Sequence, residues 1–342
     1  MPNYPLLIAE LSANHNQQKE LALQTIKAAK DAGADGVKLQ TYTADTLTLD
    51  CDNEYFQIQN GGLWDGQTLY KLYQSAYTPW EWHAELFAYA KSLGLLCFST
   101  PFDDSAVDFL ESLDNPIYKI ASFEINDIPL IRYAARKGKP MILSTGIASL
   151  DEIHEAVDAC LAENNRDITL LACTSAYPTP LTQANLVRIT DLKARFGLKV
   201  GLSDHTMGDC AAVVASVLGA TLIEKHFILD RALGGADSSF SMQPNEFAEL
   251  KQRVYDACDS LGAADYDSAA VAPSKVFKRS LFVCEDMRKG EAFNARNLRS
   301  IRPGYGIAPK HLPEILGKTA AKDIARGQPL SWELVSPSII RH

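Results

Sequence analysis

The sequence lacks several features that would assign a chain to a class at once. Its seven cysteines stand apart, at positions 51, 97, 160, 173, 210, 258 and 284, and none form a CxxC pair. An odd number of scattered cysteines argues against a disulfide framework and a thiolate metal site, and it is typical of a reducing compartment. No GxGxxG motif follows the first apolar segment, which weighs against a dinucleotide-binding fold.

Long apolar runs and basic clusters are also missing. The N-terminus has no basic region and only a short apolar core, so we expect no signal peptide. The longest mostly apolar stretch, residues 211–223, is too short to span a bilayer. The net charge of −9 argues against nucleic-acid or anionic-membrane binding, but it leaves room for a locally positive pocket. We therefore expect a cytoplasmic protein with no membrane or nucleic-acid partner.

Short apolar segments alternate with amphipathic segments along most of the chain. We expect strands at residues 6–9, 36–42, 95–102, 118–122, 140–146, 168–176, 199–206 and 221–227. Helical spacing of apolar residues is seen in segments between and after them, such as 21–32, 150–163, 209–218 and 245–261. Repeated strand–helix units imply a parallel sheet, and eight of them in about 260 residues predict a (β/α)₈ TIM barrel, an α/β fold. A doubly wound open sheet is the alternative.

Two regions depart from this alternation. Residues 43–78 are longer than a usual strand–helix loop and contain Trp64, Tyr70, Tyr73 and Tyr77, so we expect this loop to cover a substrate rather than to be only a packed surface excursion. After the last helix the chain becomes small and polar and then forms short β-like pieces. We predict a barrel domain at 1–265, a linker at 266–280 and a small, mostly β domain at 281–342.

Polar residues stand at the carboxyl end of every expected strand. Active sites of barrels lie at that end, so we expect these side chains to converge on one mouth. They are Glu10, Lys38, Gln40, Ser99, Thr100, Lys119, Ser122, Ser144, Thr145, Thr174, Ser175, Ser203, Asp204, His205, Glu224 and His226.

The residue types at these ends favour particular roles. His205 and His226, on neighbouring strands, favour a metal site over structural imidazoles, with Mn²⁺ expected and Mg²⁺ or Co²⁺ as alternatives. Lys38 and Lys119 form a clamp for a phosphate or carboxylate, unless they pair structurally. Glu10 is either a lysine's ion-pair partner or a general base or acceptor for a sugar hydroxyl.

Asp237 is a further candidate from outside the strand ends. It lies in the glycine-rich segment GGADSSFS after the last strand. Its spacing leaves a turn residue and a functional carboxylate equally open.

Segments spread over nearly the whole chain resemble the sialic acid synthase family, whose members condense phosphoenolpyruvate with an N-acetylated amino sugar. The segments are IAELSANHN, VKLQTYT, FSTPFD, YKIASFE, LSTGIA, CTSAYPTP, GLSDHT, IEKHF and RSIRPG. Each is weak alone, but all of them in this order are specific. The resemblance extends to the C-terminal antifreeze-like (SAF) module of these synthases.

Within the family, the segments AELSANH, TYTADTLTL and GGLWDGQTLYKLYQSAYTPWEWH resemble most the branch that makes pseudaminic acid. The N-acetylneuraminate branch usually has IGINH and KHQTH where this chain has LSANH and KLQTY. The resemblance therefore implies 2,4-diacetamido-2,4,6-trideoxy-L-altrose as the sugar substrate. The N-acetylneuraminate and legionaminate branches, which use the same chemistry on other sugars, remain alternatives.

The resemblance also implies residue roles. His205 and His226 match the metal ligands, and Glu10 and Asp237 match residues that hold the sugar. Arg302 matches an arginine that the SAF domain delivers into the partner's active site in a domain-swapped homodimer, with Arg299 as the alternative. The substrate-binding set is Gln40, Thr100, Lys119, Ser122, Ser144, Ser175, Tyr177 and Ser203, with Lys38 in the same phosphoenolpyruvate pocket, and Ser175 stands where the sialic branch often has Asn.

Two other classes remain on chemical grounds. A barrel with two lysines is compatible with a Schiff-base aldolase, which needs one desolvated lysine and no metal, although the paired histidines speak against it. A non-catalytic carbohydrate-binding protein would leave the ring of polar strand ends without a purpose.

Overall fold

The computed structural model describes residues 4–59, 61, 64–266 and 269–337. Two compact units make up the chain, Met1–Gly262 and Ala263–His342. No helix among the described residues is long and apolar enough to cross a membrane.

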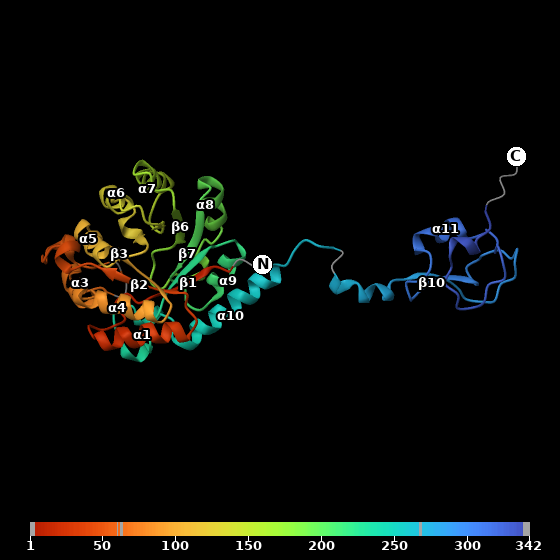
Figure 1. Ribbon diagram of the computed structural model, residues 1–342, viewed down its shortest axis with the longest axis horizontal. Coiled ribbons are helices and arrows are strands. Elements are labelled where there is room, and N and C mark those ends of the chain that lie inside the picture. Colours follow the sequence, from red (N-terminus) through yellow and green to blue (C-terminus); the bar gives the residue numbers. More distant parts are fainter. Residues whose placement is uncertain (1–3, 60, 62–63, 267–268, 338–342) are drawn as a thin grey trace. The chain divides into compact units, whose positions relative to one another are not determined.

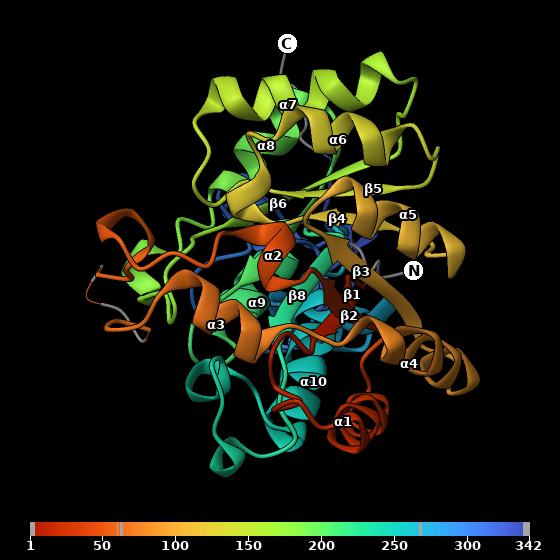
Figure 2. The same cartoon turned by 90° about the vertical axis from the view of Figure 1, so that its left-hand side faces the viewer.

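The first unit is a closed barrel of eight parallel strands, which confirms the predicted fold (Figures 1 and 2). Neighbours in the chain are neighbours in the sheet, and β1 closes the barrel by pairing with β8, Glu10 lying opposite His226. The strands are β1 (Leu6–Glu10), β2 (Gly36–Thr41), β3 (Leu96–Pro101), β4 (Tyr118–Ile120), β5 (Met141–Ser144), β6 (Ile168–Cys173), β7 (Lys199–Asp204) and β8 (Leu222–His226).

Helices follow the strands and form the outer layer (Figure 2). They are α1 (Lys19–Asp31), α4 (Trp80–Ser92), α5 (Asp104–Ser112), α6 (Ile128–Ala135), α7 (Leu150–Ala162), α8 (Arg188–Phe196), α9 (Cys210–Val217) and α10 (Pro244–Leu261), with α2 (Ala44–Leu47) and α3 (Leu69–Ala76) inside the long second loop. Local sequence fixes their ends: Ser149 and Glu152 form a capping box at the start of α7, and Gly197 ends α8 in the left-handed region.

The barrel interior is filled by a small apolar layer. Ile8, Phe98, Ile142, Leu171 and Leu222 pack together there and are buried. Because side chains alternate along a strand, the residue two positions further on points to the same interior. Those residues are Glu10, Thr100, Ser144, Cys173 and Glu224. The apolar layer therefore acts as a floor, and the polar strand ends stand above it.

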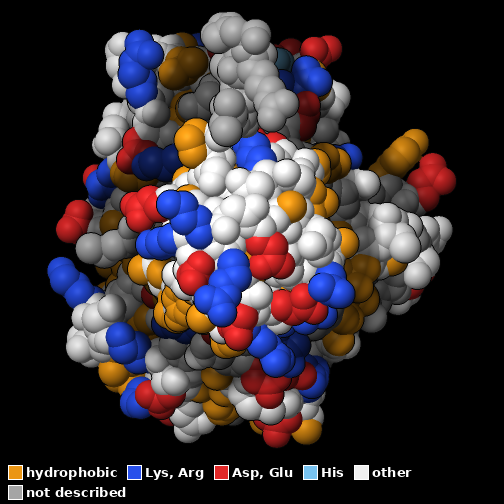
Figure 3. Space-filling view, turned by 90° about the vertical axis from the view of Figure 1, so that its right-hand side faces the viewer, with side chains coloured by type: hydrophobic (Ala, Val, Ile, Leu, Met, Phe, Trp, Pro, Cys, Tyr) orange, Lys and Arg blue, Asp and Glu red, His pale blue; other side chains and the backbone are white. Residues whose placement is uncertain are grey.

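The second unit has its own core. It contains the antiparallel pair β9 (Ser280–Val283) and β10 (Leu298–Ile301) and the short helix α11 (Leu312–Ile315). Isolated bridges such as Met287 with Ile324 extend the pairing, so less of this unit is regular strand than the alternating pattern suggests. Its buried core is formed by Leu281, Val283, Met287, Phe293, Leu298, Ile307, Ile315, Ala320, Ile324, Leu330, Leu334 and Val335. Figure 3 shows acidic and basic side chains interspersed on the face in view.

His83 ties α4 to the barrel and is a buried imidazole. Its Nε2 lies 2.9 Å from Thr41 Oγ1, and its Nδ1 lies 3.2 Å from the Pro79 carbonyl. Burial lowers the pKa of His83 from 6.5 to about 4. The unfolded chain therefore binds a proton at this position between these values, and the folded chain does not.

We predict that the contribution of His83 to the free energy of unfolding falls as pH drops through this window. His83 alone contributes a loss of about 3 kcal/mol between pH 6.5 and pH 4, at 1.36 kcal/mol per pKa unit. Urea unfolding across this range should give a shallower pH dependence for His83→Gln than for the native chain. Equal slopes of the free energy of unfolding against pH in the two proteins would contradict the lowered pKa of His83.

Candidate active site

Four charged side chains form a buried cluster at the mouth of the barrel. Glu10 Oε2 lies 2.7 Å from Lys38 Nζ. Glu224 Oε1 lies 3.7 Å from Lys38 Nζ and 3.6 Å from Lys119 Nζ. Each of the four is at most 5% exposed, so the two positive and two negative charges compensate one another in place of water.

Burial and mutual attraction shift these groups in opposite directions. Burial raises the pKa of Glu10 to about 7 despite the lysine beside it. For Glu224, burial is outweighed by Lys119 and Lys38, which lower its pKa. Burial lowers the pKa of Lys119, whereas the two carboxylates raise the pKa of Lys38 against its burial. The mouth thus holds one firmly ionised carboxylate and one close to its titration point near neutral pH.

Hydroxyl groups surround the lysines. Lys38 Nζ donates to Thr100 Oγ1 at 3.2 Å, and Ser203 Oγ donates to Glu224 Oε1 at 3.4 Å. The Ser144 hydroxyl is buried and finds no hydrogen-bond partner within the described residues. Buried polar groups are normally paired, so this hydroxyl at the end of β5 is available to a ligand at the mouth.

Gly146 gives this wall its shape. Ser175 Oγ donates to Ser122 Oγ at 2.9 Å, and Ser122 Oγ accepts from the Ile147 N–H at 3.0 Å. A Cβ at position 146 would lie 2.4 Å from Ser175 Oγ, 2.7 Å from Ser122 Oγ and 2.9 Å from Cys173 Sγ. The absent side chain lets these two hydroxyls and the Cys173 sulfur pack closely against the backbone at Gly146, so the position of the hydroxyl pair depends on a glycine here.

The two histidines face the same space. The rings of His205 and His226 lie 5.5 Å apart, and Tyr177 packs on His205 at 4.4 Å between centroids. His205 Nδ1 lies 3.0 Å from the Thr174 carbonyl, which can only accept, so Nδ1 carries a hydrogen. Burial lowers the pKa of His205, but Cys173 beside the ring outweighs it and raises the pKa; in the neutral ring Nε2 keeps a lone pair.

His226 is set up differently. Burial and the neighbouring His205 lower the pKa of His226 well below its usual range, so this ring is neutral at neutral pH. Its Nδ1 lies 3.8 Å from Asp237 Oδ2 and has no hydrogen-bond partner within the described part of the chain.

A metal ion would take few ligands from the protein here. No group of three or more His, Cys, Asp or Glu residues among those described is arranged to hold one. The two imidazoles nevertheless fit a divalent ion whose other positions are taken by water and substrate, because both rings are buried and the unpaired nitrogen of His226 needs a partner.

Ser12, Gln40 and Asp237 form a hydrogen-bonded polar group next to Glu10. Ser12 Oγ donates to Asp237 Oδ2, and Gln40 Nε2 donates to Glu10 Oε1 at 3.0 Å and to Ser12 Oγ at 3.1 Å. Burial raises the pKa of Asp237. Asp237 therefore lies at the mouth beside His226, where the sequence had left a turn residue equally open.

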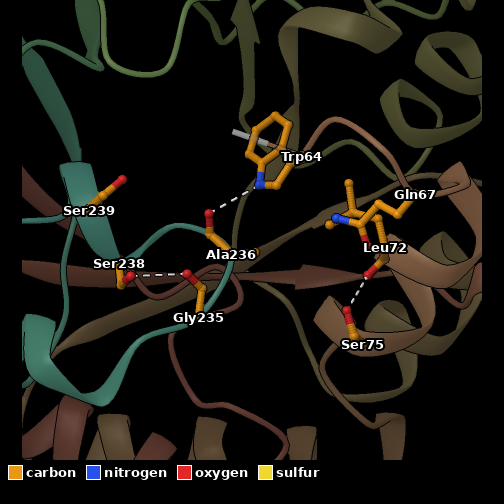
Figure 4. Close-up of a pocket in the computed structure, with 8 residues that line it drawn as sticks. All are labelled: Trp64, Gln67, Leu72, Ser75, Gly235, Ala236, Ser238 and Ser239. Atoms are coloured by element: carbon orange, nitrogen blue, oxygen red, sulfur yellow. Dashed lines mark hydrogen bonds between the residues drawn. The ribbon is translucent and has the colours of Figure 1, made fainter. Parts of the chain in front are cut away.

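The long second loop reaches the mouth through Trp64. Its Nε1 donates to the Ala236 carbonyl at 3.1 Å (Figure 4). Its ring lies 5.7 Å from that of Tyr177. This contact bounds a cavity of about 380 Å³ lined by Trp64, Gln67, Leu72, Ser75, Gly235, Ala236, Ser238 and Ser239. Tyr70 and Tyr77 are placed elsewhere, Tyr70 donating to Asp45 at the surface.

Two carboxylates at the mouth were not assigned a role from the sequence. Glu224 was noted only as a polar strand end, although its separation of two residues from His226 places both on the inner face. Glu124 follows β4 in the short 3₁₀ helix Ser122–Glu124, where no strand period applies. Burial raises the pKa of Glu124 to about 7, and its Oε2 is buried without a partner among the described residues.

Arg302 and Arg299 belong to the second unit and not to the barrel unit. Arg299 Nε lies 3.2 Å from Cys284 Sγ, whereas Arg302 follows β10 in the loop that also carries the exposed Tyr305.

Comparison with known proteins places this barrel and mouth in a family. The model of the NeuB family matches residues 25–266, and that of the SAF domain matches residues 278–336. The chain belongs to the NeuB family.

Individual relatives indicate which kinds of synthase this chain resembles. The pseudaminic acid synthase of Campylobacter jejuni is 48% identical over 325 residues, covering 95% of this chain and 94% of that protein. The N,N'-diacetyllegionaminic acid synthase of Legionella pneumophila is 36% identical, over 96% of this chain and 93% of that protein. The crystal structure of the N-acetylneuraminic acid synthetase of Leptospira borgpetersenii, in complex with citrate, has a TM-score of 0.71 and 32% identity, covering 80% of this chain and 90% of that one.

We predict that Gly146→Ala will weaken binding of an anionic ligand by about tenfold or more, since the new methyl group displaces the two serine hydroxyls. Titration calorimetry with inorganic phosphate measures the change. Gly138→Ala is the control: its Cβ meets no atom within 4 Å, so it strains the backbone without touching the serine hydroxyls. Equal affinities in all three proteins would exclude these hydroxyls from the anion site.

Proposed function

We propose that this chain is a pseudaminic acid synthase. It condenses phosphoenolpyruvate with 2,4-diacetamido-2,4,6-trideoxy-L-altrose and releases pseudaminic acid and phosphate. The observation that carries the proposal is the 48% identity along nearly the whole chain to a synthase of this specificity, together with the paired lysines and histidines at the barrel mouth.

Phosphoenolpyruvate is assigned to the side of the mouth that holds Lys38 and Lys119. Its carboxylate and phosphate need positive charge and hydroxyl donors, which Thr100, Ser203 and the hydroxyl pair beside Gly146 supply. Ser122 and Ser175 form that pair, Ser144 adds a further hydroxyl, and Tyr177 packs on His205 nearby. Glu10 and Glu224 hold the lysine side chains in place, so their ammonium groups are oriented before the anion arrives.

The sugar is assigned to the side of the mouth that holds Asp237 and Gln40. Both N–H groups of Gln40 already donate to Glu10 and Ser12, so Asp237 and Gln40 present acceptor oxygens to the hydroxyl and amide N–H groups of the sugar, and Trp64 and Tyr177 give an apolar wall near them. An apolar wall is compatible with a sugar that has a methyl group in place of a 6-hydroxyl.

Carbon–carbon bond formation then follows from this placement. The electron pair of phosphoenolpyruvate C3 forms a bond to the aldehyde carbon C1 of the open-chain sugar, and the aldehyde oxygen takes up a proton. Water adds to C2 and loses one proton. The C2–O bond to phosphate then breaks as the C2 hydroxyl gives its proton to the leaving phosphate, which leaves a nine-carbon 2-keto acid. His205 and His226 would hold a divalent ion, Mn²⁺ in our expectation and otherwise Mg²⁺ or Co²⁺, which would supply Lewis-acid polarisation of the aldehyde.

Glu10 is suited to move one of these protons. Its pKa of about 7 lets the same carboxyl accept and release a proton near neutral pH. Glu124, which follows β4, shares this property and has a buried oxygen without a partner among the described residues.

We further propose a homodimer in which the second unit of one subunit completes the site of the other with Arg302. The barrel rim exposes large apolar side chains after several strands, which a partner would cover. They are Phe123, Ile147, Leu181, Val187 and Met207. Arg302 would bind an acetamido group and orient the sugar.

The first test is phosphate release from phosphoenolpyruvate with Mn²⁺ and each candidate sugar in turn. We expect release with the 2,4-diacetamido-2,4,6-trideoxy sugar and its loss in EDTA. Release with N-acetylmannosamine or the legionaminate precursor instead would keep the chemistry and overturn the sugar assignment. If borohydride traps a covalent adduct between the substrate and a lysine, the chain is a Schiff-base aldolase and not a synthase.

The dimer is tested by mixing two inactive variants, His226→Ala and Arg302→Ala. A swapped heterodimer contains one site with both native residues, so we expect activity of about a quarter of the native level after subunit exchange. If Arg302 acts within its own subunit, every site in the mixture lacks one residue and no activity returns. The matched control mixes His226→Ala with Arg299→Ala, which shows whether Arg299 has the role assigned to Arg302.

A further inference from the structure

A second buried ion pair lies on the outer face of β7 and β8, directly behind the histidines. Lys225 Nζ lies 2.7 Å from Asp204 Oδ2, and their side chains are 2% and 1% exposed. Both strands alternate, so Asp204 and Lys225 point away from the barrel interior, whereas the following residues, His205 and His226, point into it. Asp204 and Lys225 are also partners in the register of the two strands.

The pair fixes the backbone on both sides of His205. Asp204 Oδ1 accepts from the Thr206 N–H at 2.8 Å, and Lys225 Nζ donates to the Thr206 carbonyl at 2.8 Å. The tip of β7 is therefore tied to β8 by side-chain bonds just where the regular ladder ends. The backbone of His205 is held between Asp204 and Thr206, and that of His226 directly follows Lys225.

Stability alone does not account for two charges at this position. A buried ion pair is often no more stabilising than a well-packed apolar pair of similar volume, because both charges lose their water. An apolar pair would lack the directional bonds to Thr206. What the charges add here is a defined conformation of the two strand tips.

We propose that Asp204 and Lys225 are positioning residues that set the relative placement of the His205 and His226 imidazoles for a divalent cation. The inference rests on the metal site of the proposed function. Groups that orient metal ligands from behind typically change metal affinity by about 10- to 100-fold when they are replaced.

The test compares Mn²⁺ affinity, read from the electron paramagnetic resonance signal of free Mn²⁺, with the melting temperature of the metal-free protein. Asp204→Asn removes one charge and keeps the shape, but it leaves Lys225 buried without its counter-charge. The double variant Asp204→Leu/Lys225→Met removes both charges and is expected to fold. We expect both to bind Mn²⁺ about 10- to 100-fold more weakly, the double variant with a melting temperature close to that of the native chain.

The matched control is another ion pair of β7. Lys199 Nζ lies 3.0 Å from Asp167 Oδ1 at the opposite end of the strand, where both side chains are exposed. Lys199→Met/Asp167→Leu should leave Mn²⁺ affinity unchanged.

Two results would overturn the inference in different ways. Native Mn²⁺ affinity in the folded double variant would make the pair a structural feature only. If His226→Ala binds Mn²⁺ as tightly as the native chain, the histidines are not the metal site and the positioning role falls with it. The second result also contradicts the proposed metal chemistry, whereas the first leaves that chemistry intact.

Discussion

The structure depends on charge compensation among Glu10, Lys38, Lys119 and Glu224 in the barrel mouth. A lone buried lysine or carboxylate would shift its pKa until it lost its charge. The two lysines keep positive character here because carboxylates from β1 and β8 stand within 4 Å of them. These strands lie at opposite ends of the barrel sequence, so the cluster forms only when β1 pairs with β8. The charged mouth therefore assembles in the same step in which the barrel closes.

The compensation also bears on how an acidic protein would present the anion site that we propose. The net charge of −9 lies on the whole chain, whereas the cluster is locally neutral. An arriving anion competes with the carboxylates for the lysines, and a carboxyl whose pKa is about 7 can relieve that competition by taking up a proton. The hydroxyls beside Gly146 add donors that carry no charge. The site is thus polarised without a large positive field that would attract anions in general.

Much of the fold and of the mouth follows from strand periodicity. Each predicted strand is an apolar run ending in polar residues, and position in a parallel barrel turns those ends into one ring. Residues outside the strands were harder to predict from the sequence. Asp237 meets Ser12 across 225 positions of sequence, which no local pattern encodes. Glu124 lies in a 3₁₀ turn with no inward or outward period. Asp204 resembled the other polar strand ends and Lys225 was not singled out; the three-dimensional register shows their outward pair behind the inward histidines.

The pairing of β1 with β8 has a consequence for synthesis of the chain. The ribosome releases Glu10 and Lys38 early, but the strand that carries Glu224 and His226 emerges about two hundred residues later. Until then the nascent barrel has two open edges, each with unpaired backbone groups that invite pairing with another chain. The second unit, with a separate core, is translated only after the barrel is able to close. The order of the sequence therefore leaves the first unit exposed to misassembly for most of its translation, and a chaperone that shields open sheet edges would act in that interval.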